Sequence, residues 1–247
     1  MNEKFKSLES DFRSRLPAQS IIGIRLDGKS FHTFTKQYNR PFDEGFMNTM
    51  DQTAISLMNN LITGAMFGYV QSDEITIFFT DKWGPKNQFL FDGKIEKILS
   101  TSASLATGAF LKSEPNCQGI PVFDARIFRL QDLEEVQEYM DWRRLDARKN
   151  AITMAAESLF SHKELLNVST SKRTELLIGT EFEKLPETFF NGRLIVRKPF
   201  EQTVEYLNKK NGEIEKVEVV RNKMVSVAAL RDTTESTVSS FKEILAN

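Results

Sequence analysis

The spacing of apolar side chains divides the first half of the chain into alternating strands and helices. Short apolar runs predict strands, and apolar residues repeating every three to four positions predict helices. In chain order these are a strand over 20–26, a helix over 43–62, strands over 65–71 and 75–80, a helix over 91–112, a strand over 121–130 and a helix over 133–160. The β-α-β-β-α-β order predicts an α+β fold of the ferredoxin-like, split βαβ type with helices on one face, the arrangement of polymerase palm domains.

The second half of the chain predicts a β-hairpin between helical segments. The pattern predicts a helix over 171–178 and a loop over 186–192. Strands over 193–207 and 213–229 are joined by Asn208-Lys209-Lys210-Asn211-Gly212, a favourable hairpin turn, and a helix follows over 236–245. We therefore expect a palm-like catalytic domain over 1–160 and a helical and hairpin extension over 161–247, packed together as one compact unit.

Composition narrows the class of protein. The 247 residues are 40% hydrophobic and 27% charged, and no apolar run is long enough for a transmembrane helix. The N-terminus lacks the apolar core of a signal peptide and Cys117 is the only cysteine, so we expect a cytoplasmic protein without membrane contact. A net charge of −1 requires any nucleic-acid surface to be a local patch, and two histidines with one cysteine favour an oxygen-ligated metal over zinc.

The first candidate site is the polar end of the strand over 20–26. Arg25 and Asp27 alternate with apolar neighbours, and Gly28 allows close backbone approach. Lys29, Ser30 and the backbone amides after them could cradle phosphates beside a metal held by Asp27. The alternative is an ordinary Asp-Gly turn.

The second candidate site is Ser72-Asp73-Glu74, between the two strands of a predicted hairpin. Neighbouring residues of a strand point to opposite faces, so Asp73 and Glu74 need not have the same function. A solvated turn is the alternative. The split βαβ topology brings both acidic segments to one edge of the sheet, where carboxylates can hold Mg²⁺ against the phosphates of a nucleotide.

Three colinear motifs, spread over about residues 20–155, resemble the tRNA(His) guanylyltransferase superfamily. They are Arg25-Leu26-Asp27-Gly28-Lys29-Ser30-Phe31-His32, Gln71-Ser72-Asp73-Glu74 and Asp141-Trp142-Arg143-Arg144-Leu145-Asp146. The resemblance implies a polymerase-like palm that adds nucleotides in the 3′-to-5′ direction to the 5′ end of tRNA. It also implies ATP and GTP or another NTP as substrates, and a homotetramer.

The resemblance also assigns residues to roles. It places two Mg²⁺ ions on Asp27, the Gly28 carbonyl and Asp73, and it makes Glu74 a further essential acid. The implied nucleotide-binding residues are Asp27, Gly28, Lys29, Ser30, Phe31, His32, Ser72 and Asp73.

One segment departs from the histidine-specific pattern. There the Trp-Arg-x-x-Asp motif is followed by His-Ile-Asn-Asn-Leu-Tyr-Asn, whereas this chain has Arg148-Lys149-Asn150-Ala151-Ile152-Thr153-Met154, in which only Asn150 keeps a matching amide. The chain therefore looks more like the branch of like-proteins, which extend 5′-truncated tRNAs by template pairing.

Several basic and polar side chains are candidate contacts to phosphate or tRNA. They are Arg25, Arg126, Arg143, Arg144, Arg148, Asn150, Arg197 and Lys198. Arg143, Asp146 and Asn150 share one helical face. A solvated face with local ion pairs is the alternative for this helix, and Arg126 could instead support the sheet edge.

Two other functions are compatible with these residues. Nucleotidyl cyclases also carry metal-binding acids on the first strand and on the following hairpin, so an enzyme acting on an NTP alone fits the same residues. A catalytically inactive RNA-binding module is the second alternative. The clustered acids Asp27, Asp73 and Glu74 argue against it, because like charges held close together are costly.

Overall fold

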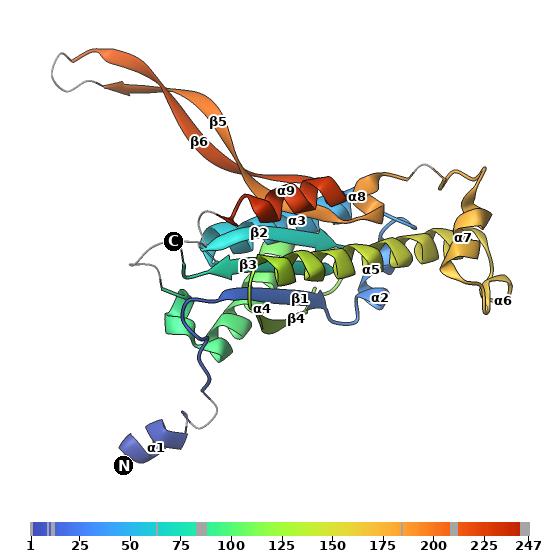
Figure 1. Ribbon diagram of the computed structural model, residues 1–247, viewed down its shortest axis with the longest axis horizontal. Coiled ribbons are helices and arrows are strands. Elements are labelled where there is room, and N and C mark those ends of the chain that lie inside the picture. The colour runs from blue at the N-terminus through green and yellow to red at the C-terminus, as the bar shows by residue number, and fades with distance from the viewer. Residues whose placement is uncertain are drawn as a thin grey trace.

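The strands of the described residues form one antiparallel sheet (Figure 1). The computed structural model describes residues 2–8, 10, 13–62, 64–82, 88–183, 185–207 and 212–242. The strands are β1 (Ile21–Gly28), β2 (Ala65–Gln71), β3 (Glu74–Thr80), β4 (Phe123–Leu130), β5 (Arg193–Leu207) and β6 (Ile214–Ala228). Their order in the sheet is β4-β1-β3-β2-β5-β6, and each strand is antiparallel to its neighbours.

Two of the long helices, α3 (Glu44–Asn60) and α5 (Leu133–Leu159), begin at side chains that cap their first turn. Asp43 accepts a hydrogen bond from the amide of Phe46 before α3, and Asp132 does the same for Glu135 before α5. The α-helices are α1 (Asn2–Leu8), α2 (Phe31–Phe34), α3 (Glu44–Asn60), α4 (Ile95–Ser113), α5 (Leu133–Leu159), α6 (His162–Leu165), α7 (Thr170–Leu177), α8 (Glu187–Phe190) and α9 (Arg231–Ser239). Short 3-10 turns span Thr35–Gln37 and Leu90–Gly93, so the helix predicted from residue 91 begins instead at Ile95.

The predicted α+β fold is confirmed. The elements β1, α3, β2, β3, α4 and β4 follow the predicted order, and their strands have the 4-1-3-2 arrangement of a split βαβ sheet. The hairpin of β5 and β6 joins this sheet through β2, where Gly68–Val70 pair with Arg193–Ile195. Beyond that base the hairpin leaves the sheet as a long twisted ribbon (Figure 1). Of its predicted turn, residues 208–211 lie outside the described residues.

Helices cover both faces of the sheet, which corrects the prediction of helices on one face (Figure 1). One core packs α3 and α4 against side chains such as Ile24 and Ile77, and the other packs α5 and α9 against Phe67 and Phe78. The reason is visible in β2 and β3, where every residue is buried. Continuously apolar strands need cover on both sides, whereas a sheet with one solvated face alternates apolar and polar residues.

Two predictions in the second half are wrong in detail. The predicted loop over 186–192 contains α8, whose Phe190 packs against the cluster of Ile152, Ala155 and Leu177. The C-terminal helix spans Arg231–Ser239, whereas the prediction was 236–245, of which 243–245 lie outside the described residues. Its first turns are rich in Thr and Ser, so apolar spacing did not reveal them; Thr234 and Val238 are the side chains it buries. Within the described part of the chain, no helix has the length and apolar character needed to cross a bilayer.

Gly192→Ala is expected to destabilise the protein more than Gly212→Ala does. Both glycines have φ near +73°, where an alanine is strained by about 1–2 kcal/mol. A Cβ on Gly192 would also lie 2.7–2.8 Å from the fully buried Tyr69 ring, whereas nothing lies within 4 Å at Gly212. Overpacking adds about 1–3 kcal/mol at Gly192. Urea unfolding measures both variants, and equal losses would contradict the packing argument.

Candidate active site at the ends of β1 and β3

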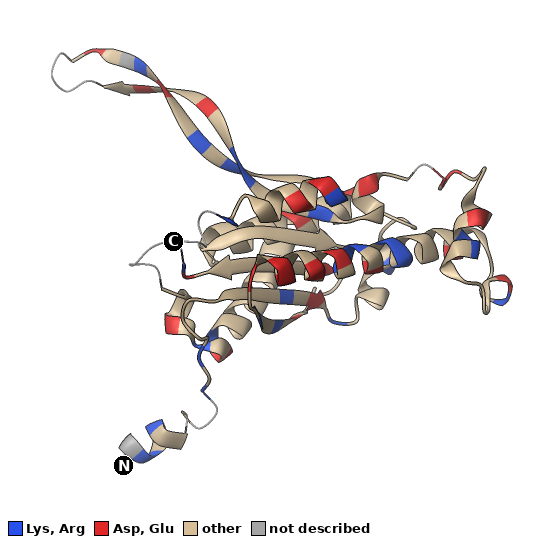
Figure 2. Cartoon of the chain, in the orientation of Figure 1, with Lys and Arg blue, Asp and Glu red and all other residues tan. Residues whose placement is uncertain are grey.

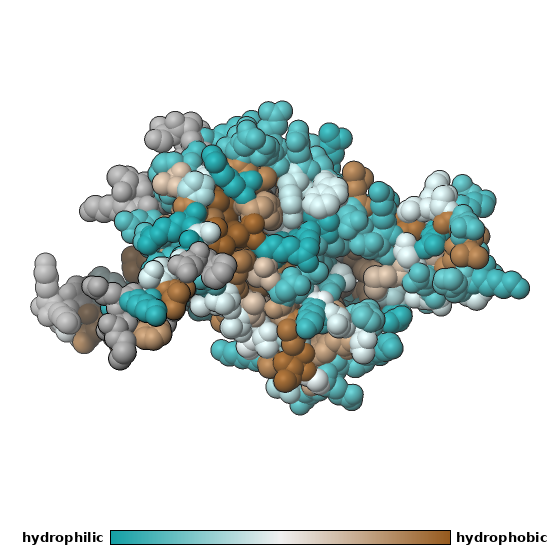
Figure 3. Space-filling model, turned by 90° about the horizontal axis from the view of Figure 1, so that it is seen from below, coloured by the Kyte–Doolittle hydropathy of each residue, from teal (hydrophilic) through white to brown (hydrophobic). Residues whose placement is uncertain are grey.

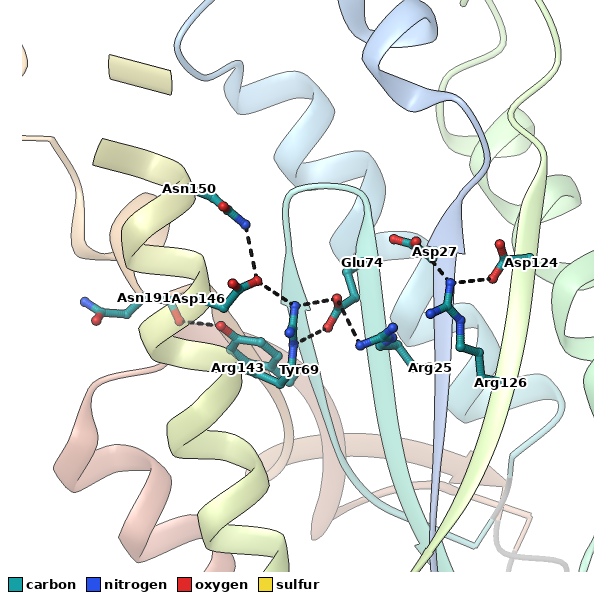
Figure 4. A network of polar contacts seen from close by, with 10 residues as sticks. All are labelled: Arg25, Asp27, Tyr69, Glu74, Asp124, Arg126, Arg143, Asp146, Asn150 and Asn191. Carbon is teal, nitrogen blue, oxygen red and sulfur yellow. Dashed lines mark hydrogen bonds and ion pairs between the residues drawn. The ribbon is translucent and has the colours of Figure 1, made fainter. Parts of the chain in front are cut away.

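Three neighbouring strand ends bring carboxylates together on the α5 face of the sheet. In the register of the sheet, Asp27 of β1 lies opposite Glu74 of β3 and opposite Asp124 of β4. Directly opposed residues of antiparallel strands point to the same face. Figure 4 shows Arg25 and Arg126 between these acids, so the strand ends carry a row of alternating charges.

Glu74 is buried and forms a bidentate ion pair with a side chain of α5. The Arg143 guanidinium donates to its two carboxylate oxygens over 2.9 and 2.7 Å, and Arg25 lies 3.9 Å away on the other side. Arg143 also donates to Asp146 over 3.1 Å, and Asp146 accepts from Asn150 over 3.3 Å. The pair therefore fixes α5 beside the β2–β3 turn.

Asp27 is more exposed than Glu74 and has a looser cationic neighbour. Arg126 lies 3.6 Å from a carboxylate oxygen of Asp27 and 3.6 Å from one of Asp124. The side chains of Asp27 and Arg126 are 39% and 54% exposed. The Asp27 carboxylate is therefore accessible to a ligand, and Arg126 is close enough to act on the same ligand.

Asp73 occupies the tight turn between β2 and β3, where Ser72 has a left-handed backbone with φ of 46°. Burial raises the pKa of Asp73, and the negative charge of Asp27 raises it further, although hydrogen bonds from its own amide and from Ser72 oppose the shift. The fold therefore brings Asp27 and Asp73 close enough for their charges to interact. Asp73 and Glu74, although adjacent in sequence, have different surroundings.

A cavity of about 780 Å³ opens beside Asp73. Its walls come from the segment after β1, the β2–β3 turn, α3, one stripe of α5, and two residues near the start of β5. The lining residues include Gly28, Ser30, Phe31, His32, Tyr38, Asn39, Arg40, Phe42, Asp43, Ser72, Asp73, Ala147, Asn150, Met154, Phe189 and Arg193. This volume is in the range of pockets that hold small molecules.

Part of the cavity wall was not predicted from the sequence. Asn39, Arg40 and Phe42 belong to a turn-rich segment after the first motif, and that polar and aromatic composition was the available signal. Arg193 pairs with Asp51 over 2.7 Å, and Ser226 donates to the same carboxylate over 2.6 Å. These partners are far apart in sequence, so no local pattern revealed them.

Two candidate tRNA contacts form hydrogen bonds inside the protein, and their role in binding RNA stays a prediction. The Arg143 side chain is only 7% exposed and is held by two carboxylates, and Arg144 donates to the Ala229 carbonyl and to Asp141. The Arg144 side chain is 15% exposed, so it is less enclosed than that of Arg143. Arg197 is exposed although it donates to the Ala65 carbonyl over 3.2 Å.

Of the remaining candidates, Arg25 is largely buried beside Glu74, with a side chain that is 17% exposed, and the others lie at the surface. Arg148 is exposed and lies over the Phe190 ring at 5.3 Å, and Lys29, Asn150 and Lys198 are also exposed. Figure 2 shows that basic residues on α5 and on the hairpin are interleaved with acidic ones. Any nucleic-acid surface is therefore a local one, as the net charge predicts.

Comparisons with known proteins decide the family. The family model described as Thg1, tRNAHis guanylyltransferase, matches residues 2–131, more than half of the chain. The chain belongs to the tRNA(His) guanylyltransferase family. Members of this family are nucleotidyltransferases that add a nucleotide to tRNA, so the predicted enzyme class and family resemblance are confirmed.

Two solved structures of Thg1-like proteins and one curated tRNA(His) guanylyltransferase are similar to this chain. A bacterial Thg1-like protein in complex with ATP is 33% identical, with a TM-score of 0.73 over 79% of this chain and 87% of that one. A bacterial Thg1-like protein in complex with GTP is 28% identical, with a TM-score of 0.77 over 96% and 98%. The tRNA(His) guanylyltransferase of Schizosaccharomyces pombe is 26% identical over 94% of this chain and 93% of its own length.

The carboxylate oxygens of the candidate site suit Mg²⁺ when a bound nucleotide supplies further oxygen ligands. Among the described residues, no group of three or more His, Cys, Asp and Glu side chains is arranged to hold a metal ion. Mg²⁺ commonly binds through one or two carboxylates, with water and substrate phosphates completing its shell. Asp27 and Asp73 provide two such carboxylates, and the pKa of Asp73 is raised first by burial and then by the negative charge of Asp27. The residues present therefore fit the ion.

Proposed function

We propose that this protein is a palm-type polymerase that adds nucleotides in the 3′-to-5′ direction to the 5′ end of tRNA. The observation that carries the proposal is that Asp73 lines a nucleotide-sized cavity and that Asp27 lies close enough for its charge to raise the pKa of Asp73. The family membership and the solved relatives with ATP and GTP support a nucleoside triphosphate as the ligand.

The cavity beside Asp73 is the proposed nucleotide site. Phe42 provides apolar surface for a base, while Ser30, His32 and Arg40 provide polar groups for the sugar and phosphates. Lys29 is exposed beside this segment and can approach a phosphate. A mixed apolar and polar wall is what a nucleotide requires.

Asp27, the Gly28 carbonyl and Asp73 would hold the proposed Mg²⁺ ions. When bound, Mg²⁺ neutralises phosphate charge and favours attack on the phosphoryl group. The chain itself orients the two carboxylates: the register of β1 with β3 fixes Asp27, and the β2–β3 turn fixes Asp73. Glu74 does not face the cavity but holds Arg143, so its proposed role is to position α5 and the turn.

The proposed reaction joins an incoming nucleotide to an activated RNA 5′ end. The RNA 5′ phosphate attacks the α-phosphate of ATP and takes up AMP with release of pyrophosphate, or the RNA carries a 5′-triphosphate. The 3′-hydroxyl of the incoming NTP then attacks that 5′ phosphate, and AMP or pyrophosphate leaves. Arg126 and Lys29 are placed to offset the charge that develops on the phosphates.

The RNA substrate we propose is a 5′-truncated tRNA copied against its own 3′ strand. The support is the segment 148–154, where only Asn150 matches the histidine-specific pattern. The test is incorporation of labelled NTPs into a 5′-truncated tRNA and into tRNA(His) lacking its extra guanylate. We expect addition on the truncated tRNA that follows the template base. Efficient guanylate addition to tRNA(His) alone would overturn this assignment of substrate, and a cyclic product from GTP alone would overturn the polymerase.

Mg²⁺ and ATP together are expected to raise the unfolding temperature of the wild-type protein more than ATP alone. Binding to the folded state stabilises it by about 2.7 kcal/mol at one hundred times Kd. The part that depends on Mg²⁺ should be lost in Asp27→Asn, because the variant removes a metal ligand. Differential scanning fluorimetry at matched ionic strength measures both shifts. An undiminished Mg²⁺ effect in Asp27→Asn would exclude this residue as a ligand.

A further inference from the structure

Arg193 is a buried arginine in the wall of the proposed nucleotide cavity. It is the first residue of β5, it is only 4% exposed, and it lines the cavity together with Asp73. Hydrophilic side chains cover most of the face of the molecule that Figure 3 draws, which is the usual place for them. Arginine is seldom buried unless it is paired, so the burial of Arg193 requires an explanation.

Protein partners use only part of the hydrogen-bonding capacity of the Arg193 guanidinium. Its Nε donates to one carboxylate oxygen of Asp51 over 2.7 Å, and Ser226 donates to the other oxygen over 2.6 Å. Its two terminal nitrogens donate to the carbonyls of Thr188 and Met47 over 3.5 and 3.3 Å. A guanidinium has five N–H donors, so one on each terminal nitrogen has no acceptor in the described part of the chain.

The terminal nitrogens of Arg193 lie nearer the cavity than its Nε does. Met47 lines the cavity, and Thr188 is next in sequence to Phe189, which also lines it. Asp51, the partner of Nε, is not part of the lining. The two N–H donors that lack an acceptor therefore belong to the end of the guanidinium beside the cavity. A buried N–H without an acceptor is costly, which favours a ligand with oxygen acceptors at this point.

The sheet register places Arg193 near the turn that carries Asp73. Arg193 pairs with Val70 of β2, three positions before Asp73. A strand rises about 3.3 Å per residue, so the two positions are about 10 Å apart along β2. This separation suits an extended triphosphate group, with one phosphate at Asp73 and another at Arg193.

We propose that Arg193 binds the outer phosphates, β or γ, of the nucleoside triphosphate in this cavity. The inference rests on the proposed function, because it takes the α-phosphate, which reacts with the RNA, to lie at Asp27 and Asp73. A guanidinium presents its donors in a rigid plane that matches phosphate oxygens, and hydrogen bonds between charged groups are the strong ones. Asp51 holds the guanidinium through Nε and leaves the terminal nitrogens for the ligand.

A purely structural pin between β5 and α3 is the alternative role for Arg193. Such a pin needs only the bond to Asp51, and its loss would disturb the cavity for every ligand alike. Binding of the outer phosphates instead affects a ligand according to the phosphates that it carries. A comparison of ATP with AMP therefore decides between the two roles.

Isothermal titration calorimetry on the full chain, with Mg²⁺ present, provides the test. Arg193→Gln combined with Asp51→Asn replaces the buried pair by two uncharged side chains, so neither charge is left without a partner. The double variant should weaken ATP binding by about 10- to 150-fold, the range for a hydrogen bond between charged groups. Its affinity for AMP should stay within about threefold of the wild type.

Two further variants keep the test independent of folding defects. Arg193→Lys retains a positive charge beside Asp51 but cannot donate to Asp51 and to the outer phosphates at once, so it should also lose affinity for ATP and not for AMP. Ser226→Ala is the matched control, because it removes a bond to Asp51 and leaves Arg193 in place. Its affinity for ATP should stay within about threefold of the wild type.

The outcomes separate this inference from the proposed function. An ATP affinity that is unchanged in both Arg193 variants, or AMP and ATP affinities that fall equally, would overturn phosphate binding by Arg193 whether or not the protein extends RNA. A wild-type protein that binds ATP through Arg193 but adds no nucleotide to RNA would refute the proposed function and support the phosphate contact.

Discussion

Asp73→Asn is expected to abolish nucleotide addition and at the same time leave the protein as stable as before, or more stable. Loss of a charged group at a phosphoryl-transfer site costs about 100- to 1,000-fold or more in rate. The stability follows from the raised pKa of Asp73, caused first by burial and then by the charge of Asp27. An acid whose pKa is raised by folding stabilises the fold only below its unfolded pKa and loses that contribution as the pH rises through its folded pKa. At neutral pH the ionised Asp73 therefore costs stability, which a neutral Asn removes.

The measurements are the rate of labelled nucleotide addition and urea unfolding without Mg²⁺, at about pH 4 and pH 7. The gain in stability of Asp73→Asn over the wild type should be larger at pH 7. Asp124→Asn is the matched control, because Asp124 also ends a neighbouring strand and contacts Arg126, but does not line the cavity. It should keep most of the activity. An active Asp73→Asn, or an equally inactive Asp124→Asn, would contradict the assignment of Asp73.

Arg143→Met is expected to lower the free energy of unfolding by about 3–5 kcal/mol. The variant leaves Glu74 buried with only Arg25, 3.9 Å away, as a cationic neighbour. A buried carboxylate without its partner bears an uncompensated desolvation cost, and this cost exceeds what the pair contributed. Because the pair also holds α5 beside the β2–β3 turn, nucleotide addition should fall as well.

A double variant distinguishes the effect of leaving the Glu74 charge without its partner from the other effects of Arg143→Met. Glu74→Gln with Arg143→Met removes both charges, so it should recover at least half of the stability lost in Arg143→Met. Lys172→Met is the control, since the Lys172–Glu175 pair is equally short at 2.6 Å but exposed, and its loss should cost less than about 1 kcal/mol. Chemical denaturation measures all three. A double variant no more stable than Arg143→Met would show that the charge is not the cause.

The sequence predicted the elements whose apolar pattern is strong and local. The hairpin of β2 and β3, the helix α3 and the helix α5 lie where periodicity places them, and their order predicts the sheet. The helices on both faces follow from the continuously apolar strands β2 and β3, which are buried on both sides, and not from the order of the elements. The start of α9 was missed because its first turns carry Thr and Ser in place of apolar residues.

The surroundings of the charged residues could not be predicted from local pattern. Arg143 has the helical spacing of a solvated stripe, and its burial follows from Glu74, which lies 69 positions earlier in the chain. The pairing of Arg193 with Asp51 spans 142 positions. Such partners are decided by the packing of elements and not by spacing. By contrast, the alternation of side chains along a strand predicts different surroundings for Asp73 and Glu74, and the structure places Asp73 in the turn and Glu74 at the start of β3.

The measurement that tests the central claim most directly is the position of the added nucleotide on RNA whose 3′ end is blocked. Periodate oxidation removes the 3′-terminal diol of a 5′-truncated tRNA and leaves its 5′ phosphate intact. With labelled GTP, ATP and Mg²⁺, we predict that the blocked RNA is extended as well as the unblocked RNA, and that Asp27→Asn and Asp73→Asn extend neither. The contradicting result is labelling that is lost when the 3′ end is blocked but is retained when the 5′ phosphate is removed. It would show that addition does not occur at the 5′ end at the Asp27 and Asp73 site.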